Sequence, residues 1–146
     1  MLTIERLTIA NEEMVKDIAR LLPQLRSDVS EHSTSLSELE KIVQDKNVAL
    51  VVAKDGDRIV GMASLYIINK FSKRSASIED VVVDENYRGQ KLGEKLTEAL
   101  ISVAREEGVG TIHLTSRPER VAANKLYQKL GFQLKETNAY TLKLRS

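Results

Sequence analysis

The segment from residue 76 to residue 116 constrains the fold more than any other part of the chain. It reads as a strand, "ASIEDVVVD", followed by a turn, a helix over Lys91–Glu107 and a second strand over Thr111–Ser116. The helix is indicated by a single apolar face, made of Leu92, Leu96, Leu100 and Val103. Two strands joined through a helix in this way lie parallel and are connected by a right-handed crossover. The sheet is therefore expected to contain a parallel pair.

The other predicted strands are antiparallel. The runs Val48–Lys54 and Arg58–Ile68 flank an Asp-Gly turn, which is typical of a hairpin. A first strand is predicted over Leu2–Ile9, and a closing hairpin over 132–144. Most of the central sheet should therefore be antiparallel.

Three further helices are predicted, over residues 12–25, 35–44 and 118–130. Asn11 and Ser35 stand at the N-cap positions of the first two, and Pro23 is expected to kink or end the first. The order of elements is then β-α-α-β-β-β-α-β-α-β-β. We expect a single α/β domain over residues 1–146, with a mixed, mostly antiparallel central sheet flanked by helices.

The composition excludes several kinds of partner and site. The chain has 22 Lys and Arg against 21 Asp and Glu, which gives no overall charge to attract nucleic acid or an anionic membrane. It has no cysteine and only two distant histidines, so we expect no metal, no disulfide and no covalent cysteine intermediate. The N-terminus lacks a signal-peptide pattern, and no run approaches the ~20 apolar residues of a membrane span. A soluble, cytoplasmic protein is expected.

The turn "YRGQKLG", Tyr87–Gly93, lies between a strand and the start of a helix. Such a position presents unpaired backbone N–H groups and the positive end of the helix dipole, which suit a phosphate group. Arg88 adds a positive charge, and Gly89 and Gly93 allow close approach to the backbone. Neither the P-loop motif nor the dinucleotide motif GxGxxG is present. By itself the turn is more typical of a solvated loop whose glycines cap the neighbouring elements.

The surroundings of this turn carry a resemblance to a known family. The run "IEDVVVDENYRGQKLGEKL", followed later by "AANKLYQKLGF", resembles the acetyl-CoA signature of the GNAT N-acetyltransferase superfamily. The "EDVVV…RG…LG" part is similar to that of glucosamine 6-phosphate N-acetyltransferases. The family's Q/R-x-x-G-x-G/A loop has glycine where this chain has Lys91, which puts the tightness of the turn in question.

The resemblance implies a donor site for acetyl-CoA. The backbone of Val81, Val82 and Val83 would pair with the pantetheine arm at a splayed pair of parallel strands. The pyrophosphate would be held by the amides of the turn, which are those of Arg88, Gly89, Gln90, Lys91, Leu92 and Gly93. Asn124 would bond the CoA arm, although it also reads as an ordinary surface residue.

The resemblance also implies three catalytic candidates. Tyr127 would protonate the leaving thiolate, which suits a phenol of ordinary pKa ~10, although a tyrosine on an apolar helix face is more often part of a core. Glu79 or Asp80 would manage the proton of the acceptor amine. In a regular strand these two side chains point to opposite faces, so only one faces the acceptor unless a bulge re-aims the other. Glu79 can act as a base only if burial raises its pKa or if it anchors a water chain. A structural salt bridge or simple ammonium binding is the alternative for both.

We therefore expect an N-acetyltransferase that uses acetyl-CoA as cosubstrate and transfers acetyl directly to a primary amine of a small molecule or protein. A catalytically silent acyl-CoA-binding domain on the same fold is the main alternative, and an interaction module that uses the final hairpin is a weaker one. Homodimers are common in the resembling family. The sequence does not identify the acceptor, because it shows no motif for that pocket.

Overall fold

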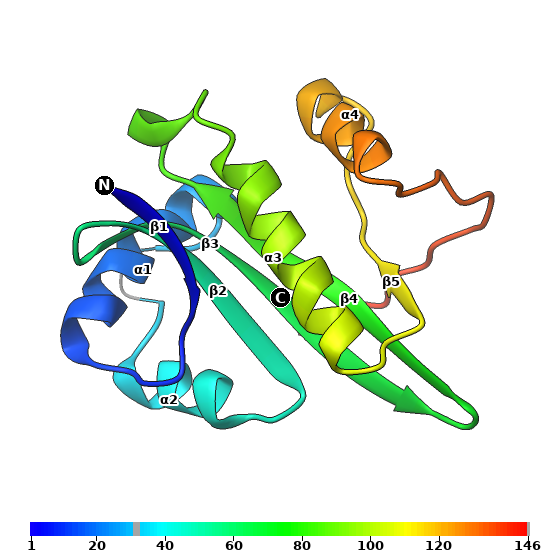
Figure 1. Ribbon diagram of the computed structural model, residues 1–146, viewed down its shortest axis with the longest axis horizontal. Coiled ribbons are helices and arrows are strands. Elements are labelled where there is room, and N and C mark those ends of the chain that lie inside the picture. The colour runs from blue at the N-terminus through cyan, green and yellow to red at the C-terminus, as the bar shows by residue number, and fades with distance from the viewer. Residues whose placement is uncertain (31–32, 146) are drawn as a thin grey trace. The chain divides into compact units, whose positions relative to one another are not determined.

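The computed structural model describes residues 1–30 and 33–145, which fall into two compact units, Met1–Thr115 and Ser116–Ser146. In the described part of the first unit, a five-stranded sheet has the order β1-β2-β3-β4-β5 (Figure 1). The strands are β1 (Leu2–Arg6), β2 (Val48–Asp55), β3 (Arg58–Lys70), β4 (Lys73–Val83) and β5 (Thr111–His113). The first four strands pair antiparallel and β5 joins β4 in parallel, which confirms the predicted mixed, mostly antiparallel sheet.

The hairpin of β3 and β4 is longer than the sequence predicted. Pairing continues to Lys70 and Lys73, so that only Phe71 and Ser72 form its tip. The polar stretch between the predicted strands is thus part of the ladder, because backbone hydrogen bonds do not depend on apolar side chains. The strand β5 is shorter than predicted and ends at His113.

Three helices of the first unit begin where the sequence predicted. They are α1 (Glu12–Leu25), α2 (Leu36–Gln44) and α3 (Leu92–Glu106). The Asn11 side chain accepts a hydrogen bond from the Met14 amide at 2.9 Å, and Ser35 Oγ accepts one from the Glu38 amide at 3.2 Å. These contacts confirm both predicted caps. Pro23 lies inside α1, shortly before the helix ends at Leu25.

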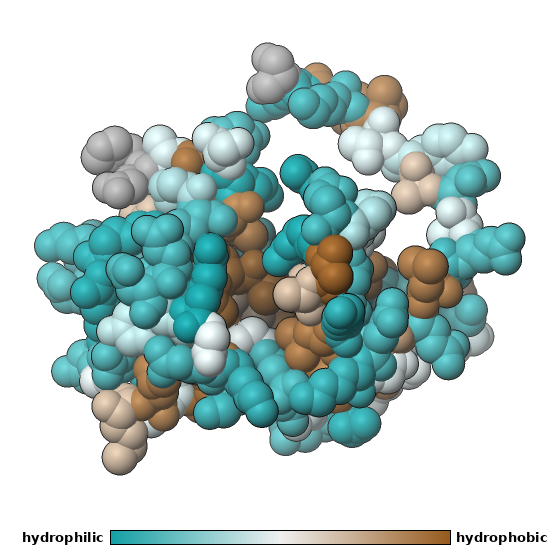
Figure 2. All heavy atoms as spheres, turned by 90° about the horizontal axis from the view of Figure 1, so that it is seen from above, coloured by the Kyte–Doolittle hydropathy of each residue, from teal (hydrophilic) through white to brown (hydrophobic). Residues whose placement is uncertain are grey.

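The helices of the first unit cover both faces of the sheet. Met62 on β3 belongs to a buried cluster with Ile18 of α1 and Leu39 of α2. Its neighbour Gly61 points the opposite way, and a Cβ there would lie 3.3 Å from Leu96 of α3. The sheet is therefore packed between α1 and α2 on one face and α3 on the other. Hydrophilic side chains cover most of the surface seen in Figure 2, and no helix among the described residues is long and apolar enough to cross a bilayer.

The second unit contains α4 (Val121–Lys129). The predicted closing hairpin is wrong, because residues 130–145, as the structure describes them, contain no strand. The apolar residues that favoured strands there are 83–95% exposed; they are Leu134, Tyr140, Leu142 and Leu144. An alternating pattern produces a stable hairpin only when one face is buried on other elements, and a hairpin alone is marginal in water.

Candidate functional site

The edge of β4 that faces β5 is open along its second half. The parallel pairing runs from Ser75–Thr111 to Ser77–His113, whereas β4 continues to Val83. Within the described residues, Val82 and Val83 pair with Met62 and Gly61 of β3, Val81 lies in a bulge of that pairing, and none of the three pairs with β5. An opening at this place is what the resemblance to the GNAT superfamily implied for the parallel pair. An open strand edge offers N–H and C=O groups to an extended ligand that contains amides.

A β-bulge breaks the regular alternation of β4 at the two predicted carboxylates. The pairing shifts between Met62–Val82 and Ser64–Glu79, and Asp80 has a left-handed backbone with φ of 55°. A bulge of this kind changes the direction of the side chain that it carries. Glu79 is exposed and accepts a hydrogen bond from Ser77 Oγ. Asp80 instead lines a pocket on the α1 and α2 face of the sheet.

The turn after β4 is anchored at several points. The Asp84 amide donates to the Val60 carbonyl at 2.8 Å, and Gln24 Oε1 of α1 accepts from the Glu85 amide at 2.9 Å. A short 3-10 helix, η1 (Glu85–Tyr87), follows. The Tyr87 hydroxyl donates to Asp55 Oδ2 at 2.7 Å, and this hydrogen bond lowers the pKa of Asp55. These contacts hold the predicted phosphate turn against the end of the β2–β3 hairpin.

The start of α3 lies at the end of the predicted phosphate turn. Its N-cap residue Lys91 makes no side-chain hydrogen bond to the helix, so Leu92 and Gly93 lie in a first turn without a side-chain cap. Lys91 has φ of 60° and Gly89 has φ of 83°. The backbone of Lys91 thus adopts the left-handed conformation that glycine favours, which is why glycine suits this position of the loop. The side chains of Arg88 and Gln90 are exposed beside it.

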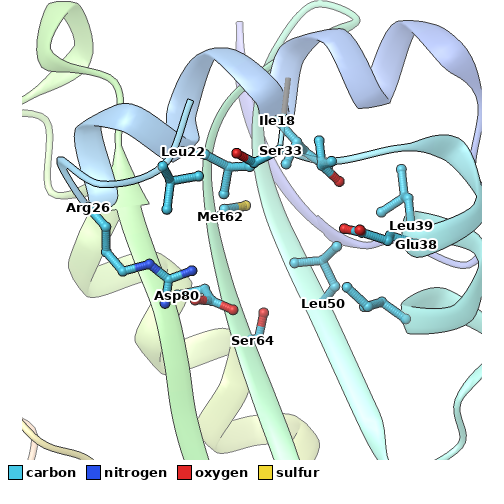
Figure 3. A pocket seen from close by; sticks show the side chains of 13 residues that line it. Ile18, Leu22, Arg26, Ser33, Glu38, Leu39, Leu50, Met62, Ser64 and Asp80 are labelled. Atoms are coloured by element: carbon cyan, nitrogen blue, oxygen red, sulfur yellow. The ribbon is translucent and has the colours of Figure 1, made fainter. Parts of the chain in front are cut away.

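The pocket beside Asp80 has a volume of about 280 Å³ and is built between α1, α2 and the sheet (Figure 3). The Arg26 guanidinium lies next to the Asp80 carboxyl group, with the Ser64 hydroxyl below them. The carboxylate of Glu38 points into the pocket from the opposite side. The rest of the lining is mostly apolar and comprises Ile18, Leu22, Val29, Leu39, Ile42, Leu50 and Met62, together with Ser33 and Thr34. This pocket was not predicted from the sequence, because its residues come from five elements and the segment after α1.

Burial affects the ionisation of two groups near this pocket. Burial raises the pKa of the Asp80 carboxyl group, while Arg26 opposes the shift and Glu79 adds to it. Burial also raises the pKa of Tyr66 on β3, and the charges of Asp80 and Glu79 raise it further. Tyr66 is not among the residues that the sequence singled out. A tyrosine in the middle of an apolar strand looks like a core residue until the bulge in the neighbouring strand is known.

The two predicted residues on α4 belong to the second unit. Tyr127 is 7% exposed, and its ring meets that of Phe132 edge to face with centroids 5.8 Å apart. Burial raises the pKa of Tyr127, against the opposing effect of Arg120. Asn124 Nδ2 donates to the carbonyls of Arg117 and Arg120, both at 2.9 Å. The amide nitrogen of Asn124 thus binds the chain just before α4, and its oxygen makes neither of these bonds.

The chain is similar to known acetyltransferases over most of its length. The model of the acetyltransferase (GNAT) family matches residues 12–132. A glucosamine 6-phosphate N-acetyltransferase of Trypanosoma brucei brucei is 42% identical over 54% of this chain, and the match spans about half, 54%, of that relative. A probable glucosamine 6-phosphate N-acetyltransferase 2 of Oryza sativa subsp. japonica is 31% identical over 88% of this chain and 80% of its own length.

A solved structure extends this likeness to the fold. The crystal structure of an acetyltransferase of Trypanosoma brucei is 28% identical, with a TM-score of 0.79, and the match covers 98% of this chain and 100% of that one. Both the family model and the rice relative cover far more than half of the chain. The chain belongs to the acetyltransferase (GNAT) family.

Proposed function

We propose that this protein is an acetyl-CoA-dependent N-acetyltransferase that moves acetyl directly to a primary amine in a ternary complex. The observation that carries the proposal is the open edge of β4, which leads through an anchored turn to the uncapped start of α3. A ligand with an amide-bearing arm and a pyrophosphate matches both features in this order. Membership of the family supports the same donor.

In this proposal the donor is held mainly by backbone groups. The arm of acetyl-CoA pairs with Val81–Val83, and the pyrophosphate accepts hydrogen bonds from the amides of Arg88–Gly93. The Arg88 side chain supplies the positive charge. The Oδ1 atom of the Asn124 amide accepts a hydrogen bond from an N–H group of the CoA arm.

The transfer forms a C–N bond and breaks a C–S bond. The amine nitrogen attacks the thioester carbonyl, whose oxygen is polarised by a backbone N–H near Val81, and the CoA thiolate leaves. The acceptor ammonium gives up two protons in total. One of them is balanced by the proton that the Tyr127 hydroxyl delivers to the leaving sulfur. The other is released to solvent. The chain has no cysteine to carry the acetyl group in a covalent intermediate.

We assign the management of the amine proton to Asp80. Neutralising an amine of pKa ~10 at pH 7 requires about 4 kcal/mol, and an ordinary carboxylate is too weak a base to take up the proton readily. Burial raises the pKa of Asp80 and so narrows this gap. Glu79 is exposed, so it lacks the burial that a role as a base requires.

Calorimetric titration with acetyl-CoA tests the donor site. We expect Arg88→Ala to weaken binding by about tenfold, because it removes a charged hydrogen-bond donor from a phosphate. Arg105→Ala is the matched control, since Arg105 lies in the last turn of α3, at the end of the helix away from the turn that contains Arg88, and it should bind as the unchanged protein does. Equal affinities of the two variants, or no binding at all, would contradict the proposal.

A variant of Tyr127 distinguishes an enzyme from a catalytically silent acyl-CoA-binding domain. Tyr127→Phe should retain acetyl-CoA binding and lose about a hundredfold in turnover with an amine, because the leaving thiolate loses its acid. Tyr140→Phe is the control, because Tyr140 is 89% exposed. Unchanged turnover in Tyr127→Phe would remove the assigned acid.

A further inference from the structure

The pocket that contains Asp80 limits which amine the enzyme accepts, and this inference depends on the proposed function. Asp80 and Val81 are consecutive residues on the bulged part of β4. An acetyl group held at the backbone of Val81 and an amine held at Asp80 would therefore lie within a few ångströms of each other, because adjacent Cα atoms are about 3.8 Å apart. The reacting nitrogen then belongs at the Asp80 end of the pocket.

The charges of the pocket suit a cation and oppose a dianion. Among the described lining residues, Arg26 is the one cationic side chain, and it faces the Asp80 carboxyl group (Figure 3). Glu38 places a second carboxylate on the opposite side. A phosphate group on the acceptor would meet two carboxylates and a guanidinium already close to one of them. An ammonium group would find Asp80 and the Ser64 hydroxyl as acceptors.

The walls of the pocket suit an apolar body. Seven aliphatic or methionine side chains line it, of which six come from α1, α2, β2 and β3 and one, Val29, from the segment after α1. Besides the charged groups and Ser64, the lining offers the hydroxyl groups of Ser33, which is exposed, and of Thr34. Most of the wall thus has no partner for the several hydroxyl groups of a sugar, and burying such groups without partners is unfavourable. The volume of about 280 Å³ is at the lower end of the range for small-ligand sites.

We infer that this pocket is the acceptor site and takes a primary amine on a small, largely apolar body, such as an arylalkylamine, in preference to a phosphorylated amino sugar. The ammonium group lies between Asp80 and Ser64, and the apolar body lies between Leu22, Leu39 and Met62. The specificity thereby differs from the one named for the two relatives.

Steady-state kinetics at saturating acetyl-CoA test the inference, with release of the CoA thiol as the readout and 2-phenylethylamine, ethylamine and glucosamine 6-phosphate as acceptors. We expect kcat/KM for 2-phenylethylamine to exceed that for glucosamine 6-phosphate by at least tenfold. Leu22→Ala should lower kcat/KM for 2-phenylethylamine by about tenfold and leave ethylamine nearly unchanged, because only the larger amine contacts the removed side chain. A general loss of structure would lower both.

A charge reversal in the pocket gives a second readout. Glu38→Lys should reduce the preference for 2-phenylethylamine over glucosamine 6-phosphate by about tenfold, since it places a cation in the pocket. Glu40→Lys is the matched control, because Glu40 is an exposed residue of the same helix and does not line the pocket. Its preference should remain that of the unchanged protein. Calorimetric titration with acetyl-CoA verifies that both variants retain a folded donor site.

The outcomes separate the inference from the proposed function. Faster acetylation of glucosamine 6-phosphate than of 2-phenylethylamine would overturn the inference and leave the transferase function intact. The inference would also be overturned if Glu38→Lys and Glu40→Lys had equal preferences. Binding of 2-phenylethylamine that Leu22→Ala weakens, without acetylation of any of the three amines, would support the pocket as an amine site and overturn the transferase function.

Discussion

At the scale of single residues, the backbone of the turn Tyr87–Gly93 is strained at Lys91. A residue with a side chain is less stable than glycine in the left-handed region by about 1 kcal/mol. Lys91 has φ of 60°, and no side-chain hydrogen bond to the helix compensates for it. We predict that Lys91→Gly raises the free energy of unfolding by roughly 0.5–1 kcal/mol.

Urea unfolding of two variants measures this strain. Lys91→Gly removes a side chain at a positive φ, and Gly89→Ala introduces one. Gly89→Ala should lower the free energy of unfolding by about 1 kcal/mol, because Gly89 has φ of 83°. A Cβ at Gly89 would meet no atom within 4 Å, so crowding would contribute nothing to this loss. A destabilised Lys91→Gly would show that the lysine side chain has a structural role that outweighs its backbone strain.

Asp80 is a second residue that lowers the stability of the folded protein at neutral pH, because burial disfavours its charged carboxylate. Burial raises its pKa in the folded protein above the unfolded value. The carboxyl group therefore binds protons more tightly in the folded state, so its contribution to stability is present at low pH and is lost as the pH rises through the folded pKa. Asp80→Asn should raise the melting temperature at pH 7, and this gain should disappear near pH 3.

Thermal unfolding of Asp80→Asn between pH 3 and pH 7 tests the sign of this effect, and Asp28→Asn at an exposed position provides the control. Turnover of Asp80→Asn should fall by about tenfold or more at the same time, because the amide cannot accept the amine proton. Lower stability at pH 7 would mean that the attraction of Arg26 outweighs the burial of the carboxylate.

At the scale of elements, one buried carboxylate ties α1 to the sheet. Asp17 Oδ2 accepts a hydrogen bond from the Ile59 amide at 3.0 Å, and its other oxygen accepts from Arg20. We predict that Asp17→Ala lowers the free energy of unfolding by about 1–3 kcal/mol, because a buried N–H group loses its partner. Glu13→Ala removes an exposed ion pair of the same helix and should change it by less than about 0.5 kcal/mol. Equal effects in chemical unfolding would contradict a specific role for Asp17.

The sequence predicted an element correctly where its residue pattern agrees with the burial of its side chains in the structure. The caps at Asn11 and Ser35, the Asp-Gly hairpin and the parallel crossover were all found. The bulge that turns Asp80 into the pocket could be considered only as an alternative, because a bulge depends on the pairing of two strands and leaves little trace in one. The prediction of a closing hairpin was wrong because its alternating apolar residues are not buried on another element.

At the scale of the whole molecule, we predict that the chain unfolds as one domain. The Ser116–Ser146 unit has a single helix among its described residues, and chains below about 40 residues seldom fold without additional support. Amide hydrogen exchange in increasing denaturant should therefore give α4 and α3 the same global unfolding free energy. Exchange of the α4 amides at much lower denaturant than those of α3 would indicate two independent domains.

The tip of the β3–β4 hairpin has a consequence for how the chain can be divided. Phe71 is fully exposed there, in a two-residue turn, which is the kind of place where proteases cut and where new termini are tolerated. A chymotryptic cut after Phe71 separates Arg26, Glu38 and Ser64 from Asp80 and the phosphate turn. The two fragments would then have to reassemble along the β3–β4 ladder to rebuild the site. The hairpin thus offers a natural position for a split enzyme whose activity reports the meeting of its halves.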